Sequence, residues 1–132
     1  MSIFLILLAA GDSKRLNSGK PKPFCKVNNK TLLEHSLNNF KNIKEIKKII
    51  LVYNKKHRSY LNKLKLKNIV KIIGGNSRQE SVFIALKKIK KMGCKKVLIH
   101  DAARPLTSKL IIKKLINKLK KKPCSYTCNK KL

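Results

Sequence analysis

Apolar and polar residues alternate along this chain in blocks whose lengths predict strands and helices in turn. Four runs have the length and apolar character of strands: Ser2–Leu8, Lys48–Tyr53, Ile69–Ile73 and Val97–His100. The first is the most continuously apolar, which is typical of a parallel strand that is covered on both faces. Patterns typical of helices lie between and after these runs, at Thr31–Phe40, Lys55–Leu64, Ser77–Met92 and Thr107–Lys121.

Two of the expected helices begin at capping boxes, in which a Ser or Thr is followed three residues later by Glu. Thr31 and Glu34 form one box, and Ser77 and Glu80 form the other. We expect the last two helices to bury two apolar faces, made of Val82, Phe83, Leu86 and Ile89, and of Leu110, Ile111, Leu115 and Leu119. The alternation predicts an α/β fold of Rossmann type, with a mostly parallel sheet and helices on both faces.

The charge of the chain changes this picture less than its size suggests. Formal net charge is +29, from 34 basic and 5 acidic residues, which favours a polyanionic partner such as nucleic acid. However, only four of the basic residues are arginine, and aromatic residues, which stack on bases, make up only 5% of the chain. We therefore attribute the lysines to the codon bias of an AT-rich genome, and nucleic-acid binding is the weaker alternative.

Length, cysteines and hydropathy narrow the class further. A chain of 132 residues suits one domain. The four cysteines form no CxxC pair, so free thiols in a reducing compartment are favoured over a disulfide framework. The apolar run at residues 3–10 is too short to cross a membrane and has no basic residue before it, so we expect a cytoplasmic protein without a membrane partner.

The loop after the first strand has the composition of an anion site. Ala9, Ala10 and Gly11 are small, so their backbone N–H groups can approach a phosphate closely. Basic residues follow at Lys14, Arg15, Lys20 and Lys22. This combination suits a nucleoside triphosphate, although it matches neither GxxxxGK[ST] nor GxGxxG. A flexible basic loop is the alternative interpretation.

Two later loops supply different chemistry at the same expected edge of the sheet. Asp101, in "HDAARP", can hold a magnesium ion between phosphate oxygens, and Arg104 can bind a second phosphate. A structural ion pair between Asp101 and Arg104 is the alternative. In "GGNSRQESV", Gly75 allows close approach, and Asn76 and Ser81 can read a base, unless this segment is a plain helix cap.

Together, "LAAGDSKRL…KPKPF", "GGNSRQESV" and "HDAARP" resemble the 2-C-methyl-D-erythritol 4-phosphate cytidylyltransferase family. The resemblance runs from Ile3 to about Lys121 and implies the nucleotidyltransferase version of the Rossmann-like fold. It also implies transfer of CMP from CTP to a sugar-alcohol phosphate, with release of pyrophosphate, in non-mevalonate isoprenoid biosynthesis. Another sugar-phosphate nucleotidyltransferase is the alternative within this class.

The resemblance assigns a role to each motif residue. Ala9, Ala10 and Gly11 would wrap the nucleotide, and Arg15 and Lys22 would be catalytic, stabilising charge on the α-phosphate. Cytosine would be read by Gly75, Asn76 and Ser81. Asp101 would bind Mg²⁺, and Arg104 would contact the acceptor phosphate. Members of the family form homodimers.

The end of the chain departs from the family. The family continues well past this length, so we expect its C-terminal strands to be missing and residues 1–122 to form the N-terminal nucleotide-binding portion. The tail, residues 123–132, does not read as a strand of that fold. A one-base shift in an assumed coding sequence for Ser125–Lys130 would encode Val-Ile-Pro-Ala-Ile-Lys, as a frameshift near Lys122 would produce. We therefore expect weak nucleotide binding, marginal stability and little transfer activity.

Overall fold

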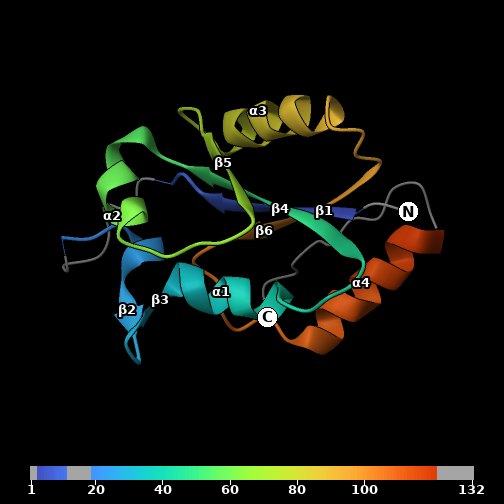
Figure 1. Ribbon diagram of the computed structural model, residues 1–132, viewed down its shortest axis with the longest axis horizontal. Coiled ribbons are helices and arrows are strands. Elements are labelled where there is room, and N and C mark those ends of the chain that lie inside the picture. Colours follow the sequence, from blue (N-terminus) through green and yellow to red (C-terminus); the bar gives the residue numbers. More distant parts are fainter. Residues whose placement is uncertain (1–2, 12–18, 122–132) are drawn as a thin grey trace.

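A computed structural model describes residues 3–11 and 19–121 of the chain. Its main feature is a four-stranded sheet in the order β5-β4-β1-β6, in which every neighbouring pair is parallel (Figure 1). The strands are β1 (Ile3–Ala9), β4 (Ile46–Tyr53), β5 (Ile69–Ile73) and β6 (Lys96–Asp101). The chain moves outward from β1 to β4 and β5 and then crosses to β6 on the other side of β1. The strand order therefore reverses at β1, which is where ligands bind in open parallel sheets.

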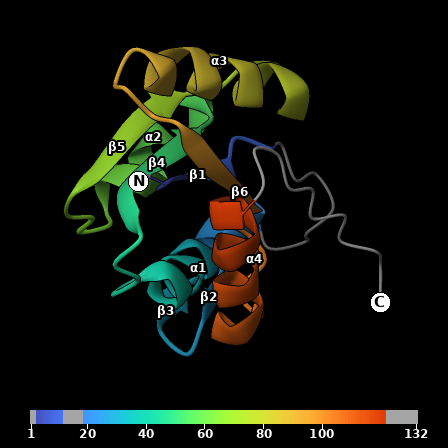
Figure 2. The same cartoon turned by 90° about the vertical axis from the view of Figure 1, so that its right-hand side faces the viewer.

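Helices cover both faces of the sheet, as the sequence predicts (Figure 2). On one face, α3 (Arg78–Lys90) packs against the even-numbered residues of β1, including Phe4 and Ile6. On the other face lie α1 (Leu32–Phe40), α2 (Arg58–Asn62) and α4 (Lys109–Lys121), which pack against the odd-numbered residues. Every residue of β1 is buried, because a central parallel strand has helices on both sides.

Short elements between β1 and α1 are absent from the sequence-based prediction. A 3₁₀ turn, η1 (Lys22–Phe24), leads into a hairpin of β2 (Lys26–Val27) and β3 (Lys30–Thr31). Asn28 and Asn29 form its tip with φ of 52° and 65°, a conformation that Asn tolerates better than most residues. These strands are two residues long, which is too short for an alternating pattern to reveal.

The cap of α1 is confirmed. Thr31 Oγ1 accepts a hydrogen bond from the Glu34 backbone N–H at 3.1 Å, and the Glu34 carboxylate accepts one from the Thr31 N–H at 3.0 Å. The box fixes the start of α1 directly after the hairpin. The expected helix at Lys55–Leu64 is shorter, because its first turn is the 3₁₀ segment η2 (Lys55–His57) and α2 ends at Asn62.

The expected buried faces of α3 and α4 are partly wrong. In α3 the buried residues are Ser81, Ala85 and Ile89, whereas the Phe83 side chain is 60% exposed. Ser81 and Ala85 let the first half of this helix approach the sheet closely, and Ile89 completes the buried face, whereas Phe83 and Leu86 are exposed. In α4 the buried residues are Ile112, Ile116 and Leu119, and Leu110 and Ile111 are exposed. Among the described residues, no helix has the length and apolar character needed to span a bilayer.

Candidate active site

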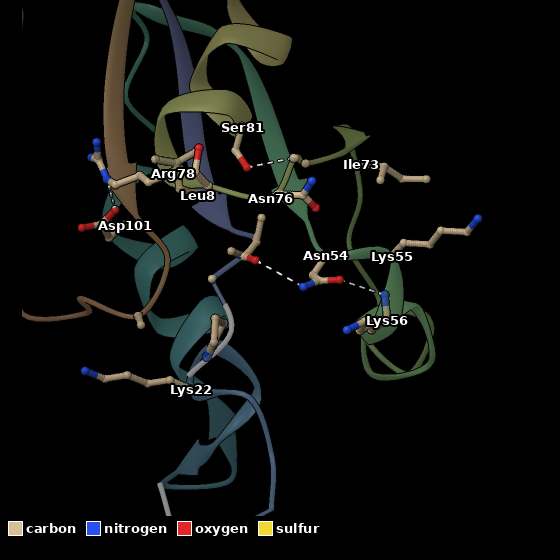
Figure 3. Close-up of a pocket in the computed structure, with 18 of the residues that line it drawn as sticks. Leu8, Lys22, Asn54, Lys55, Lys56, Ile73, Asn76, Arg78, Ser81 and Asp101 are labelled. Carbon is tan, nitrogen blue, oxygen red and sulfur yellow. Dashed lines mark hydrogen bonds and ion pairs between the residues drawn. The ribbon is translucent and has the colours of Figure 1, made fainter. Parts of the chain in front are cut away.

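A cleft of about 1160 Å³ lies where the four strands end. Its walls are the segments that follow the carboxyl ends of β1, β4, β5 and β6, together with Lys22 and Pro23. Figure 3 shows Arg78 and Asp101 at one end of this cleft and Lys55 and Lys56 at the other. Its volume is at the upper end of the roughly 300–1,000 Å³ of usual ligand pockets, so the cleft is large enough for a nucleotide.

The segment after β1 forms the floor of the cleft. Ala9 is buried and paired with Tyr53 of β4, and the Leu8 carbonyl accepts a hydrogen bond from the Ala102 N–H at 2.8 Å. Gly11 is exposed, and a Cβ built on it would meet no atom of residues 3–11 and 19–121 within 4 Å. The described chain thus passes from the buried strand to an exposed position at Gly11. Arg15 lies outside the described residues.

Lys22 enters the cleft from a rigid turn. It begins η1, whose N-cap is Pro21, and the next two residues, Pro23 and Phe24, are buried. The Phe24 N–H donates to the Pro21 carbonyl at 2.9 Å, and Phe24 stacks on Tyr60 with ring centroids 5.5 Å apart. Because Pro23 and Phe24 anchor the turn in the core, the exposed Lys22 side chain starts from a fixed backbone position.

The loop after β5 is held by close contacts with its neighbours. The Gly74 N–H donates to the Tyr53 carbonyl at 2.8 Å, and the Gly75 N–H donates to Ser81 Oγ at 3.0 Å (Figure 3). A Cβ on Gly74 would lie 2.7 Å from the Ala10 Cβ, so the two loops touch where a side chain cannot fit. Gly75, Asn76 and Ser81 therefore come together with Ala10, as the motifs predict.

The second expected capping box is only half formed. Ser77 caps α3, and its Oγ accepts a hydrogen bond from the Glu80 N–H at 3.0 Å. The Glu80 carboxylate, however, accepts from the N–H of Asn76 at 3.0 Å, one residue before the cap. Glu80 therefore fixes the loop that carries Asn76 as well as the helix start. Ser81 is 2% exposed, and its hydroxyl oxygen is already engaged with Gly75.

Asp101 ends β6 and faces two arginines. Its Oδ2 lies 3.4 Å from Arg104 Nε, and its Oδ1 lies 3.4 Å from Arg78 Nε. The ion pair between Asp101 and Arg104 that the sequence left open is therefore present, and Arg78 joins it from α3. Exposure of these side chains is 34% for Asp101 and 60% or more for the arginines, so all three are accessible from solvent.

The turn after β6 is anchored below the cleft. Ser36 of α1 is fully buried and donates a hydrogen bond to the Ala102 carbonyl at 2.7 Å. His100 Nε2 lies 2.8 Å from the Arg104 carbonyl, and its ring packs against Phe40. Burial lowers the pKa of the His100 imidazole below its ordinary value. His100 is thus a structural histidine at the strand end, with its ring nitrogen paired to a backbone carbonyl.

The sequence-based prediction missed the wall formed by the segment after β4. Asn54, Lys55 and Lys56 line the cleft. The Asn54 side chain accepts from the Lys56 N–H at 3.0 Å and points its amide nitrogen toward the Ala10 carbonyl at 3.5 Å. The rule that parallel strands present ligand-binding loops at their carboxyl ends applies to β4 as well, and it identifies this segment.

No group of three or more His, Cys, Asp or Glu residues that could hold a metal ion occurs among residues 3–11 and 19–121. Asp101 is the only acidic residue among the described residues that line the cleft. A site with one carboxylate suits Mg²⁺, which is usually bound by one or two carboxylates together with substrate phosphates and water.

The parallel sheet and the cleft at its carboxyl edge, with small residues and cations around it, define an α/β protein whose cleft suits a nucleotide-like anion. Residues 3–127 match the family model described as 2-C-methyl-D-erythritol 4-phosphate cytidylyltransferase (IspD), and the chain belongs to this family.

Individual relatives agree with the family assignment. The bifunctional enzyme IspD/IspF of Pelagibacter ubique is 48% identical over 124 residues, which cover 94% of this chain and 33% of that protein. The 2-C-methyl-D-erythritol 4-phosphate cytidylyltransferase of Wigglesworthia glossinidia brevipalpis is 44% identical over 116 residues, or 86% of this chain and 50% of that one. The structure of the bifunctional IspDF from Campylobacter jejuni superposes with a TM-score of 0.77 at 34% identity, covering 92% of this chain and 31% of that one. The chain thus spans half or less of the length of these relatives.

Proposed function

We propose that this chain carries the nucleotide-binding part of a cytidylyltransferase that transfers CMP from CTP to 2-C-methyl-D-erythritol 4-phosphate. The observation that carries the proposal is the convergence of the three motif loops and Lys22 on one cleft. In this proposal the reaction is a step of non-mevalonate isoprenoid biosynthesis, as the resemblance to the family implies. The cytoplasmic location remains a prediction, and the homodimer is what the resemblance implies for the family.

In this proposal, the first loop and Lys22 hold the triphosphate. Ala9, Ala10 and Gly11 bring backbone groups to the phosphates, and their small side chains leave the backbone open to close approach. Lys22, together with Arg15, stabilises the charge that builds on the α-phosphate. The buried anchor of η1 supports this role, because electrostatic stabilisation requires a charge that is already in position.

The loop at Gly75 and Asn76 reads the base. The N–H groups of both residues are engaged by Ser81 and Glu80. Because these N–H groups are already used, the backbone groups left to contact a base are the two carbonyl oxygens. In this proposal they accept a hydrogen bond from the 4-amino group of cytosine. Uracil has no amino group at that position. Ser81 acts by holding Gly75 in place, and the Asn76 side chain adds donors and acceptors at the rim.

Asp101 and Arg104 serve the phosphate end of the reaction. Asp101 would hold a divalent cation, Mg²⁺ in the cell, and this ion would neutralise charge on the triphosphate oxygens. Arg104 would bind the acceptor phosphate through its fork of N–H donors. The acceptor phosphate oxygen attacks the α-phosphorus in line, the bond from that phosphorus to the bridging oxygen breaks, and pyrophosphate leaves. No side-chain nucleophile is needed, because catalysis rests on positioning and electrostatics.

Nucleotide selectivity tests the proposal. With Mg²⁺ present, calorimetric titration should show that CTP binds more tightly than ATP, GTP or UTP. We expect little pyrophosphate release from this chain, and what there is should depend on both CTP and 2-C-methyl-D-erythritol 4-phosphate. Equal affinity for all four nucleotides, changing only with salt concentration, would identify a general polyanion site and refute the proposal.

Lys22→Ala tests the catalytic assignment. Its lost charge matters most in the transition state, so the rate of pyrophosphate release should fall by more than the affinity for CTP does. Lys20→Ala is the matched control. Lys20 is an exposed lysine on the same loop, but its side chain does not line the cleft. Equal losses in the two variants would contradict a specific role for Lys22.

A further inference from the structure

Arg78 is a cleft residue to which the proposed function gives no role. It is the first residue of α3, and its side chain is 63% exposed. Lysine supplies nearly all the positive charge of this chain, so an arginine facing the cleft suggests a need for the planar guanidinium. Figure 3 shows this side chain directed at Asp101, on the wall opposite Lys55 and Lys56.

The two arginines occupy both oxygens of the Asp101 carboxylate. Arg78 Nε lies 3.4 Å from Oδ1, and Arg104 Nε lies 3.4 Å from Oδ2. Two positive charges thus face the one carboxylate that the described cleft offers to a cation. A divalent cation needs a carboxylate oxygen and is repelled by any guanidinium that remains beside it.

The two arginines differ in how they are attached to Asp101. Arg104 belongs to the same turn, since its backbone N–H donates to the Asp101 carbonyl at 3.1 Å and its own carbonyl faces His100 Nε2 at 2.8 Å. Arg78 comes from a different element, 23 residues away in sequence, and reaches Asp101 through its side chain. Arg78 can therefore leave the carboxylate without disturbing the turn, whereas the Arg104 backbone stays beside Asp101 as part of that turn.

We propose that Arg78 is a positioning residue that occupies Asp101 in the free cleft and yields it when a divalent cation arrives with the triphosphate. The bare cation is excluded by the two guanidinium groups. A cation bound to a triphosphate brings compensating negative charge and offers Arg78 phosphate oxygens in exchange for the carboxylate. Metal and nucleotide consequently enter together. This inference rests on the proposed function, because it takes Asp101 to be the metal ligand.

Paramagnetic broadening by Mn²⁺ tests the inference without an activity assay. In the ¹⁵N-labelled chain, the amide signals of Ala102 and Ala103 report Mn²⁺ at Asp101, and they can be followed with and without CTP. Arg78→Gln should lower the Mn²⁺ concentration that half-broadens these signals by roughly fivefold without CTP, the Coulomb effect of one unit charge near a divalent ion in screened, solvent-like surroundings. With CTP the difference from the wild type should shrink. Arg58→Gln is the matched control, because Arg58 lies on α2, outside the cleft, where its guanidinium contacts the Tyr53 hydroxyl.

Asp101→Asn separates the two levels of the proposal. If it abolishes the local broadening with CTP present, Asp101 binds the metal, and the Arg78 comparison then decides the inference. Arg78→Gln titrating like Arg58→Gln in the absence of CTP would overturn the role of Arg78 and leave the metal site standing. Unchanged broadening in Asp101→Asn would instead refute the metal site itself, and the inference about Arg78 would fall with it.

Discussion

Gly74→Ala should destabilise the chain and weaken nucleotide binding together, because Gly74 is where two cleft loops touch. A Cβ at this position would lie 2.7 Å from the Ala10 Cβ, 2.7 Å from Ser81 Oγ and 3.0 Å from the Val52 Cγ1. The Ala10 Cβ is fixed to the backbone and cannot rotate away. Ser81 Oγ can rotate, but it then loses the hydrogen bond that it accepts from the Gly75 N–H at 3.0 Å.

The size of the effect follows from these contacts. Overpacking of a well-packed site costs about 1–3 kcal/mol, and a lost hydrogen bond costs about 0.5–1.5 kcal/mol. Since both consequences come from one added methyl group, we expect a loss of about 2 kcal/mol in the free energy of unfolding. For a chain of this length that corresponds to a fall in melting temperature of roughly 8 °C.

Urea and thermal unfolding followed by far-UV circular dichroism measure the change, and calorimetric titration with CTP measures the loss of binding. Gly11→Ala is the control for stability, because a Cβ there would meet no described residue within 4 Å. If Gly74→Ala unfolds at the same urea concentration as Gly11→Ala, the close contact between the two loops is not a real constraint. Our account of the cleft floor would then be wrong.

Three further predictions concern the supports of the cleft. Ser36→Ala should lower the free energy of unfolding by about 1–3 kcal/mol in urea titrations, because it leaves the Ala102 carbonyl without its buried donor, whereas exposed Ser59→Ala should have little effect. Thr31→Ala should cost about 1 kcal/mol by removing the α1 cap, and an unchanged unfolding midpoint would contradict the reciprocal capping box. Glu80→Ala should weaken CTP binding while barely changing stability, because the exposed carboxylate orders the Asn76 backbone; Glu45→Ala, an acidic residue away from the cleft, should leave binding unchanged.

The sequence by itself determined the four strands of the main sheet, their direction and the loops that carry the chemistry. The run at Ile69–Ile73 is a strand with the predicted bounds, because a short run rich in Ile and Val that ends at glycine is typical of a strand. Once the strands are parallel, their carboxyl ends must share one edge, so the motif loops at Ala9, Gly75 and Asp101 had to meet there. The capping box at Thr31 was equally readable, since it depends on residues three apart.

Tertiary structure alone decided which helix faces are buried and which charges pair. Phe83 looks like a core residue in sequence, but the sheet accepts the face with Ser81, Ala85 and Ile89, and Phe83 is left exposed. The contact between Arg78 and Asp101 joins residues 23 apart on different elements, and no local pattern encodes it. Local propensity and periodicity act over a few residues. The packing of α3 against the sheet sets the position of Arg78, and that packing depends on contacts distributed over the whole fold.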